Sequence, residues 1–244
     1  MSKGRVALIT GAGGGMGIAT VTRFAKEGYR IAAVDLNAAG LKEAAGHAGG
    51  AEVRSYTGDL SNQETVRDIV RKIEGDFGQV DALVNLVGWT QTSRFVDEDN
   101  SYWTKIIGVN FLSAIYATHA VVPGMIERKS GKIVYVTSDA GRVGQSGEAV
   151  YAGMKGGVIA FAKSIARELS RYNINVNCTA PGPTDTPLEH DQDPEIVQRI
   201  IKKIPFRRWA KPEEQAAAMA FLCSTDADYI TGQVLSVSGG LTMS

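Results

Sequence analysis

The sequence predicts an α/β protein made of one doubly wound domain, in which a seven-stranded parallel sheet is covered by helices on both faces. Short apolar runs alternate along the chain with longer stretches whose apolar residues recur every three or four positions. This alternation is typical of a parallel sheet that is buried on both sides. The 28 glycines lie mostly at the ends of the apolar runs, which indicates tight turns and close approach of the backbone to a ligand.

The bulk composition is that of an ordinary soluble enzyme-sized domain. The chain has 244 residues, 44% of them hydrophobic and 21% charged, and 26 basic residues balance 26 acidic ones. The charge balance therefore gives no indication of nucleic-acid binding. We expect no signal peptide and no apolar span of about 18 residues, and hence a cytoplasmic protein. Cys178 and Cys223 lie in apolar stretches and are expected to be buried thiols, and three scattered histidines predict no metal site.

The first predicted strand, residues 5–10, runs into a glycine-rich loop at residues 10–17 and then into a helix that ends near residue 27. In this context the loop predicts a Rossmann-type domain, whose helix N-terminus binds a pyrophosphate, although a merely flexible turn is the alternative. The other predicted strands are residues 30–34, 52–56, 80–87, 132–138, 174–180 and 233–237. The other predicted helices are residues 37–46, 61–77, 100–128, 149–172 and one from about residue 211, the second opened by a Ser61 and Glu64 capping box.

An acidic residue, Asp35, ends the second predicted strand about 20 positions after the glycine loop. A carboxylate at this place can accept hydrogen bonds from a ribose 2′-hydroxyl and would repel a 2′-phosphate. No arginine in the loop offsets that repulsion, so the sequence favours NAD over NADP. The alternative is that Asp35 simply caps the helix that follows it.

A hydroxyl residue, Ser138, closes the strand at residues 132–138, and Tyr151 and Lys155 follow on a predicted helix. Residues at i and i+4 lie one turn apart on the same helix face. A cation about 4 Å from a phenol contributes up to roughly 4 kcal/mol at an effective dielectric near 20, enough to lower the pKa of the phenol well below its ordinary value. The pair therefore predicts a proton donor and acceptor near neutral pH, although a chance surface pair is the alternative.

Two further polar residues stand out from their surroundings. Asn110 is an amide among apolar residues of the long helix, and a buried amide must find hydrogen-bond partners. It can bond to the backbone or bend the helix around a water. Asp59 follows the third strand, where it can meet an adenine edge or act only as a turn residue.

These residues together resemble the short-chain dehydrogenase/reductase family over essentially the whole chain. The resemblance implies that Asn110, Ser138, Tyr151 and Lys155 are catalytic and that Asn110 positions a proton-relay water. Residues 85–88, Asn-Leu-Val-Gly, depart from the usual Asn-Asn-Ala-Gly of the family but keep its first and last residues. The resemblance implies cofactor contacts by Thr10, Gly11, Gly13, Gly15, Met16, Gly17, Asp35, Leu36, Asp59, Leu60, Asn85, Val87, Gly88, Tyr151, Lys155, Pro181, Gly182, Thr184 and Thr186.

Within the family, residues 138–151, 181–186 and 230–243 are most similar to the 2-hydroxycyclohexanecarboxyl-CoA dehydrogenase type, an enzyme type of alicyclic and aromatic acid breakdown. The polar, proline-containing segment 187–204 is typical of a substrate lid. The expected substrate wall is formed by this lid and by Trp89, Val143, Gln145 and Glu148. Five basic residues in and after the lid either meet CoA phosphates or form a solvated face: Arg199, Lys202, Lys203, Arg207 and Arg208.

The sequence thus predicts reversible, NAD-dependent oxidation of a secondary alcohol by hydride transfer. An enzyme of the 3-oxoacyl-[acyl-carrier-protein] reductase type is the alternative, although such enzymes usually take NADPH. A second alternative is a regulatory nucleotide-binding protein on the same fold, which has no need of the complete catalytic set. The family resemblance also implies a homotetramer.

Overall fold

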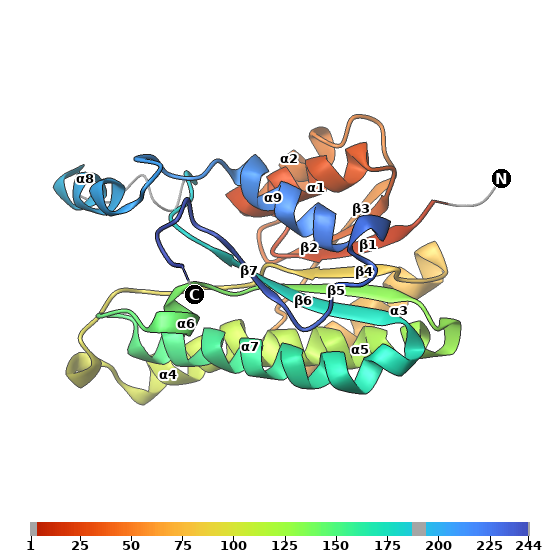
Figure 1. Ribbon diagram of the computed structural model, residues 1–244. Coiled ribbons are helices and arrows are strands. Elements are labelled where there is room, and N and C mark those ends of the chain that lie inside the picture. The colour runs from red at the N-terminus through yellow and green to blue at the C-terminus, as the bar shows by residue number, and fades with distance from the viewer. Residues whose placement is uncertain (1–3, 187–193, 244) are drawn as a thin grey trace.

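The computed structural model describes residues 4–186 and 194–243, and it confirms the predicted fold class. Seven parallel strands pair in the order β3-β2-β1-β4-β5-β6-β7 (Figure 1). The strands are β1 (Val6–Thr10), β2 (Arg30–Asp35), β3 (Val53–Thr57), β4 (Ala82–Asn85), β5 (Gly131–Val136), β6 (Ile174–Pro181) and β7 (Val234–Val237). The order reverses between β1 and β4, which is where ligands bind in open α/β sheets.

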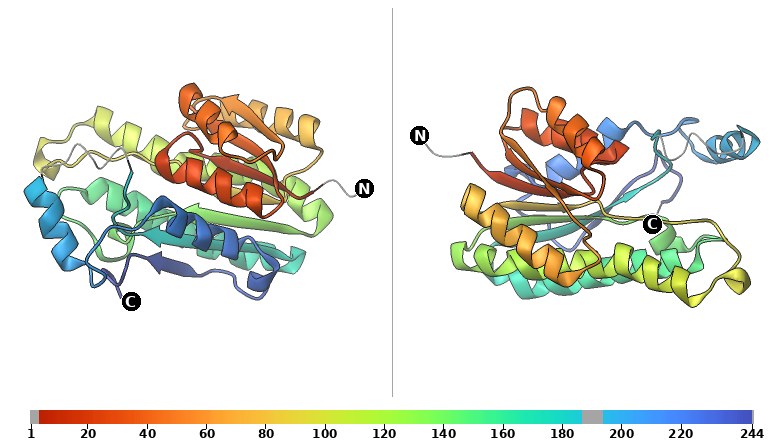
Figure 2. Two further views of the ribbon diagram at one scale, coloured as in Figure 1. Left: turned by 90° about the horizontal axis from the view of Figure 1, so that it is seen from above. Right: turned by 180° about the vertical axis from the view of Figure 1, so that it is seen from behind.

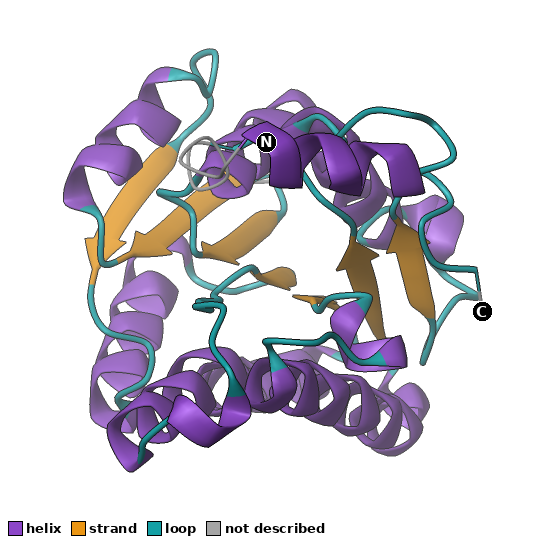
Figure 3. Cartoon of the chain, turned by 90° about the vertical axis from the view of Figure 1, so that its left-hand side faces the viewer, coloured by secondary structure: helices purple, strands orange, loops and turns teal. Residues whose placement is uncertain are grey.

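Helices cover both faces of the sheet. On one face lie α1 (Gly15–Lys26), α2 (Ala38–Gly46) and α9 (Pro212–Leu222), and on the other lie α3 (Gln63–Phe77), α5 (Ser113–Arg128) and α7 (Ala149–Leu169) (Figures 1 and 2). Figure 3 looks at the end of the molecule to which the strand arrows lead. The short helix α6 (Ala140–Val143) follows β5 at this end, and α8 (Pro194–Lys203) lies beyond the end of β6. The two helix layers therefore leave the carboxyl ends of the strands for the site.

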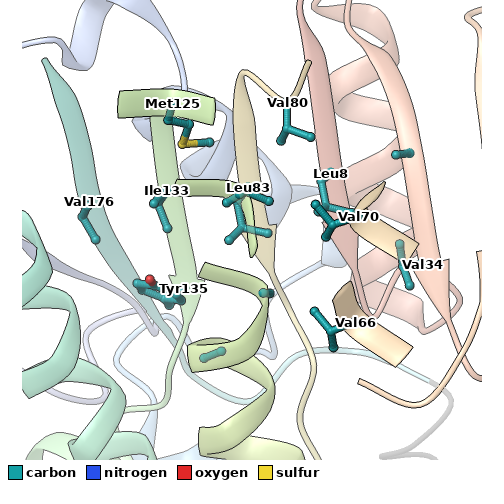
Figure 4. Close-up of a cluster of buried hydrophobic side chains, with 14 of the residues drawn as sticks. Leu8, Val34, Val66, Val70, Val80, Leu83, Met125, Ile133, Tyr135 and Val176 are labelled. Carbon is teal, nitrogen blue, oxygen red and sulfur yellow. The ribbon is translucent and has the colours of Figure 1, made fainter. Parts of the chain in front are cut away.

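The core is two apolar layers separated by the sheet, because successive side chains of a strand point to opposite faces. Leu8 and Tyr135 point toward α3, α5 and α7, together with Val66 and Met125 from those helices (Figure 4). Ile9 lies in the second layer, beneath α1, α2 and α9. Cys178 and Cys223 are buried free thiols, one in each layer, as the sequence predicts.

The predicted start of α3 is wrong by one residue, because Asn62 rather than Ser61 is the N-cap. The Asn62 side chain accepts a hydrogen bond from the Thr65 N–H. Ser61 instead donates its hydroxyl to Asp59 Oδ1, 2.7 Å away. Both residues are good caps, and the turn around Asp59 decides between them.

The long helix predicted over residues 100–128 is continuous but contains a π-helical segment, Gly108–Leu112, between α4 (Asn100–Ile107) and α5. By length and composition the whole stretch, Asn100–Arg128, could cross a membrane, so the expectation that no such span exists was wrong. In the fold, Ala117, Val121 and Met125 of this stretch pack in the core against the sheet. Core helices of soluble proteins can also be this long and apolar, so the length and composition of this stretch do not favour a membrane span.

The region predicted as a lid, residues 187–204, is partly described. Residues 187–193 lie outside the described part of the chain, and α8 occupies most of the remainder. The helix α6 was not predicted from the sequence, because its four residues are too few to show a helical period.

Candidate active site

Tyr151 and Lys155 lie on the first turns of α7, one turn apart as predicted. The Lys155 ammonium lies 5.7 Å from the centre of the Tyr151 ring and donates a hydrogen bond to the Val136 carbonyl at the end of β5, 3.0 Å away. Lys155 is only 3% exposed, and this burial lowers the pKa of its ammonium to about 8. A buried cation beside a phenol is thus held by the strand that leads to Ser138.

The Ser138 hydroxyl follows β5 at the carboxyl edge of the sheet. Its Oγ accepts a hydrogen bond from the Ala140 N–H, 3.2 Å away, at the start of α6. Gly141 of α6 packs on α7 so closely that a Cβ would lie 2.7 Å from the Gly156 nitrogen. Glycine at this position therefore brings the serine turn against the helix that carries Tyr151 and Lys155.

Asn110 lies in the π-helical segment and is buried, with partners in the loop after β4. Its Nδ2 donates to the carbonyls of Trp89 and Ile106, at 2.7 and 3.1 Å, and its Oδ1 accepts from the Trp89 N–H at 3.2 Å. A Cβ at Gly88 would lie 3.1 Å from Lys155 Nζ and 3.2 Å from Asn110 Oδ1. Asn110 and Lys155 thus converge on Gly88, and of the two interpretations of Asn110 the structure contains the bonds to the backbone.

The glycine-rich loop turns between β1 and α1. Gly11 has φ of +69°, and a Cβ at Gly17 would lie only 2.1 Å from the Gly11 carbonyl oxygen. The first turn of α1, which includes Gly15 and Met16, therefore packs directly on the loop, with its N–H groups at the carboxyl edge. This backbone arrangement fits a pyrophosphate, because the helix start offers unpaired donors and partial positive charge.

Asp35 ends β2 beside this loop, and its carboxylate is fixed by backbone donors. Oδ2 accepts from the Gly13 N–H and Oδ1 accepts from the Asn37 N–H, both at 2.8 Å. The cap of α2 is Asn37, whose side chain accepts from the Gly40 N–H, so the interpretation of Asp35 as the cap was wrong. A Cβ at Gly13 would lie 3.0 Å from the Asn37 carbonyl, so a larger side chain there would require its neighbours to shift. Leu36, next along the chain, is exposed.

The ends of β1 and β4 pair side by side beneath the loop, with Thr10 opposite Asn85. Within residues 4–186 and 194–243, the buried Thr10 Oγ1 and Asn85 Nδ2 have no hydrogen-bond partner. Val87 is half-buried after β4. Asp59, after β3, accepts from the Ser61 N–H and hydroxyl, which fits the turn interpretation, and Leu60 beside it is buried.

The segment after β6 is held by β7 and by the loop before α9. The Gly182 N–H donates to the Val237 carbonyl at 3.1 Å, and the buried Thr184 hydroxyl donates to the Gly182 carbonyl at 2.9 Å. Gln215 of α9 donates to Thr184 Oγ1, 3.2 Å away. The Thr184 hydroxyl therefore shapes the segment, while Pro181 and Thr186 are half-buried at its two ends.

Most of the expected substrate wall lies near this edge. Glu148 is half-buried and accepts from the Thr90 hydroxyl at 3.3 Å, and burial raises the pKa of its carboxyl above the ordinary value. The Trp89 ring lies 3.5 Å from Lys105 Nζ and also contacts Tyr102, neither of which the sequence singled out. Val143 and Gln145 are exposed.

The five basic residues of the lid region differ in their surroundings. Arg208 is paired with both oxygens of Glu214, at 2.7 and 2.6 Å, and this pairing lowers the pKa of Glu214 to about 2. Arg207 donates to the Lys202 carbonyl and Arg199 to the Glu195 carbonyl. Lys202 and Lys203 are exposed at the end of α8. In the described parts of the chain, no group of three or more histidine, cysteine or acidic side chains is arranged to hold a metal ion.

A family model described as "Enoyl-(Acyl carrier protein) reductase" matches residues 11–242. The chain is 37% identical to the 3-oxoacyl-[acyl-carrier-protein] reductase FabG of Thermotoga maritima, over 99% of each chain. It is 36% identical to the acetoacetyl-CoA reductase of Allochromatium vinosum, over 98% of this chain and 99% of that one.

Solved structures match over the same extent. The structure of NAD⁺-bound xylitol dehydrogenase superposes with a TM-score of 0.92 at 32% identity, covering 98% of this chain and 100% of that one. Levodione reductase gives a TM-score of 0.92 at 30% identity, covering 97% and 96%. The chain therefore belongs to the short-chain dehydrogenase/reductase family and is an oxidoreductase.

Proposed function

We propose that this oxidoreductase catalyses the reversible, NAD-dependent oxidation of a secondary alcohol to a ketone. The observation that carries the proposal is the convergence of Lys155 and Asn110 on Gly88, with Tyr151 one helical turn from Lys155 and Ser138 at the end of the strand that binds the Lys155 ammonium. These four polar groups come from three segments near the carboxyl edge of the sheet, where ligands bind in this kind of fold.

In the proposed reaction Tyr151 is the acid and base. Its phenolate oxygen takes the proton from the alcohol hydroxyl, and in the reverse direction its phenol returns that proton to the carbonyl oxygen. Ser138 donates a hydrogen bond to the same oxygen and stabilises the charge that develops there. A bound nicotinamide cofactor supplies the hydride acceptor for the alcohol carbon.

Lys155 and Asn110 support the phenol. The Lys155 ammonium favours the phenolate by its charge, and its pKa of about 8 lets it exchange a proton near neutral pH. In addition, Lys155 is proposed to bind the hydroxyls of the nicotinamide ribose. Asn110 Oδ1 has two lone pairs, of which the Trp89 N–H uses one. The second is available to a water between Asn110 and Lys155, which supports a proton relay to solvent.

NAD rather than NADP is proposed as the cofactor because of Asp35. Its carboxylate lies at the end of β2, anchored to Gly13 N and Asn37 N, where it can accept hydrogen bonds from ribose hydroxyls. A 2′-phosphate placed there would meet a fixed negative charge. Gly13 supplies no compensating cation, and a larger side chain at that position would displace its neighbours. The proposed cofactor contacts are the residues that the sequence predicts, with the Thr184 hydroxyl engaged inside the protein.

For the substrate we propose a cyclic or acyl-CoA hydroxy compound, as in the 2-hydroxycyclohexanecarboxyl-CoA dehydrogenase type. Relatives whose names specify acetoacetyl-CoA and 3-oxoacyl-carrier-protein substrates support a thioester. Lys202 and Lys203 are exposed at the end of α8 and are free to meet phosphate groups in this proposal, whereas Arg208 is already paired with Glu214. A 3-oxoacyl-[acyl-carrier-protein] reductase is the alternative activity, which Asp35 disfavours through its cofactor preference.

A regulatory protein that only binds a nucleotide is the alternative of another class. The complete set of Asn110, Ser138, Tyr151 and Lys155 disfavours it, because binding alone does not require an acid, a base and a proton relay. We further propose a homotetramer in the cytoplasm. The exposed side chains of Phe206, Leu235 and Met243, in and beside β7, are compatible with burial against further copies of the chain.

A substrate panel tests the proposal. Purified protein is assayed for NAD⁺ and NADP⁺ reduction with cyclic alcohols, aryl alcohols and hydroxyacyl-CoA thioesters, and for NADH and NADPH oxidation with 3-oxoacyl thioesters on CoA and on carrier protein. The proposal expects turnover of a secondary alcohol with NAD⁺ and a higher kcat/KM for a cyclic thioester than for a linear one. Turnover only of carrier-protein thioesters with NADPH would favour the alternative enzyme, and nucleotide binding without any turnover would favour the regulatory protein.

A further inference from the structure

A buried carboxylate, Asp139, directly follows Ser138 in the chain and has no part in the proposed reaction. Asp139 is 6% exposed. Its Oδ1 accepts from Arg142 Nη1 at 3.1 Å, and the Ser236 hydroxyl lies 3.1 and 3.0 Å from its two oxygens. Burying a carboxylate is costly unless it is paired and hydrogen-bonded, so this side chain is held in one place by the partners that compensate its burial.

The Asp139 contacts join two strands that are not neighbours. Ser236 belongs to β7, and β6 lies between β5 and β7 in the sheet. The Ser236 hydroxyl in turn hydrogen-bonds the Ser238 hydroxyl at 2.9 Å. Gly182, after β6, packs so tightly on Ser238 that a Cβ at Gly182 would lie 2.8 Å from the Ser238 Cα. Asp139 therefore ties the end of β5 to β7, and the Gly182–Ser238 contact joins the end of β6 to the same part of β7.

The same residue also fixes the turn that carries Ser138. The Asp139 carbonyl accepts from the N–H groups of Arg142 and Val143, at 2.9 and 3.1 Å, and so forms α6. The Ala140 N–H, next to Asp139, donates to Ser138 Oγ. A displacement of Asp139 would consequently move the Ser138 hydroxyl relative to the segment that begins at Gly182.

We propose that Asp139 is a positioning residue for the reaction, which ties the Ser138 end of β5 to the end of β7 and so sets Ser138 relative to the Gly182 segment. The inference rests on the proposed function, in which Ser138 meets the reacting oxygen and Pro181, Gly182 and Thr186 contact the cofactor. The expected effect on rate is large, because a displacement of about 1 Å at a reacting centre can lower a rate by about 100-fold.

The opposite end of the same strands contains a matched polar cluster. Lys132 Nζ, in β5, lies 2.8 Å from Asn175 Oδ1 of β6 and 2.6 Å from Asp228 Oδ1 before β7. Asn175 Nδ2 also donates to the carbonyls of Asp228 and Ile230, at 2.9 and 3.0 Å. This cluster joins the same three segments at the amino edge, away from the proposed chemistry, so it serves as a control for stability alone.

The test compares Asp139→Asn with Asp228→Asn in the full chain, since each removes one carboxylate that joins these strands. The readouts are kcat, the KM values for alcohol and NAD⁺, Tm, and amide hydrogen exchange of residues 137–143 and 180–186. We expect Asp139→Asn to lower kcat by about 10-fold to 100-fold and to speed exchange in both segments. Asp228→Asn is expected to leave kcat within about twofold of the wild-type value, a difference in activation free energy of under about 0.5 kcal/mol.

Ser236→Ala is the second variant, because it keeps the Asp139–Arg142 ion pair and removes the Ser236 hydroxyl, together with its bonds to Asp139 and Ser238. We expect it to lower kcat in the same direction by a smaller factor, and it keeps the proposal testable if Asp139→Asn does not fold. Two results together would overturn the proposal. They are a wild-type kcat in Ser236→Ala and a loss of activity in Asp139→Asn that a smaller folded fraction explains completely. Equal losses of kcat in Asp139→Asn and Asp228→Asn would also overturn it.

Failure of the proposed function is a separate result. Absence of alcohol turnover by the wild-type chain, or retained turnover in Tyr151→Phe, would refute the proposed function without involving Asp139. In that case hydrogen exchange alone tests the role of Asp139. Equal exchange rates of residues 137–143 and 180–186 in Asp139→Asn and Asp228→Asn would overturn that role.

Discussion

The two edges of one sheet use the same residue types for different purposes. At the carboxyl edge, a Cβ at Gly17 would lie 2.1 Å from the Gly11 carbonyl and one at Gly182 would lie 2.8 Å from Ser238. At the amino edge, Gly28 and Gly78 have φ of +81° and +89°, and no atom lies within 4 Å of a Cβ built on either. At these positions glycine is needed for close packing at one edge and for turn conformation at the other, whereas Gly11 of the carboxyl edge combines close packing with a positive φ.

Charged groups differ between the edges in the same way. Lys155, at the carboxyl edge, is 3% exposed, and the side chains of the Asp139–Arg142 pair are 8% and 13% exposed. The Lys132–Asp228 pair at the amino edge has side chains that are 15% and 65% exposed. Desolvated charges interact more strongly and hold more fixed positions than hydrated ones. In these examples the charged side chains that are costly to bury lie at the carboxyl edge, where the reaction is proposed.

Gly17→Ala is expected to have the largest effect in this comparison. The new methyl group meets the Gly11 carbonyl and the Ala12 backbone, so the loop must move away from the pyrophosphate position. We expect the Kd for NADH to rise by about 100-fold or more, equivalent to at least about 2.7 kcal/mol. Gly78→Ala, the control, should cost about 1 kcal/mol of stability through its positive φ and leave Kd unchanged. Fluorescence titration with NADH and urea unfolding measure both, and tight NADH binding by Gly17→Ala would contradict the packing argument.

Asp35→Ser is expected to change cofactor choice. The substitution removes the negative charge at the end of β2, so the ratio of kcat/KM for NAD⁺ to that for NADP⁺ should fall by about 10-fold or more, about 1.4 kcal/mol. Initial rates with both cofactors measure the ratio. Asp59→Ser is the control. Asp59 is proposed to meet the adenine, which NAD⁺ and NADP⁺ share, so its loss should leave the ratio of the two kcat/KM values unchanged. A wild-type preference for NADP⁺ would refute the role given to Asp35.

Lys155→Met is expected to change how stability depends on pH. Burial lowers the pKa of Lys155 to about 8 in the folded chain, below its ordinary value, so the unfolded chain binds more protons between these two pKa values. The contribution of Lys155 to stability therefore rises as pH increases through this window. Between about pH 7 and about pH 9.5 the wild type should gain about 2 kcal/mol relative to Lys155→Met. Urea unfolding of both proteins at the two pH values measures this. An equal change of stability with pH in the two proteins would contradict the burial of the Lys155 ammonium.

Gly75→Ala is expected to have the smallest effect, and it should stabilise the protein. Gly75 lies within α3, has no positive φ, and has no atom within 4 Å of a Cβ built on it. Alanine should therefore add about 0.5–1 kcal/mol of stability through its higher helix propensity. Kinetics should not change, because Gly75 lies near the end of α3 that leads into β4, at the amino edge of the sheet. A destabilised Gly75→Ala protein, measured by urea unfolding, would show that the space around this helix is not open.

Local patterns predicted most of the fold and the residues at its carboxyl edge. The alternating apolar runs and the spacings of Asp35, Ser138 and Tyr151 depend on residues close together in the chain. The structure places Asp35 at the end of β2, Ser138 just after β5 and Tyr151 in the first turn of α7. What could not be predicted depends on distant partners. The Asp139 carboxylate is held by Ser236, which is 97 residues away in the chain, and no local pattern in the sequence predicts this contact. The π-helical segment likewise depends on the Trp89 backbone, which Asn110 reaches from 21 residues away.

The cap of α3 shows a different limit. Ser61 and Asn62 are both good capping residues, so local propensity favours neither. The contact of Ser61 with Asp59 decides the boundary, and that contact needs the strand that places Asp59. Sequence patterns therefore locate elements and strand-end residues, whereas the partners of a buried polar group come from the folded chain.

The central claim, that the carboxyl edge holds a Tyr151-dependent alcohol oxidation, is tested most directly by comparing Tyr151→Phe with Tyr172→Phe. Both substitutions remove one hydroxyl, one at the start of α7 and one just after its end. We expect Tyr151→Phe to lose nearly all turnover, with kcat lowered by about 1000-fold or more. Its Kd for NADH should stay near the wild-type value. Tyr172→Phe should keep both. Substantial turnover by Tyr151→Phe would contradict the account.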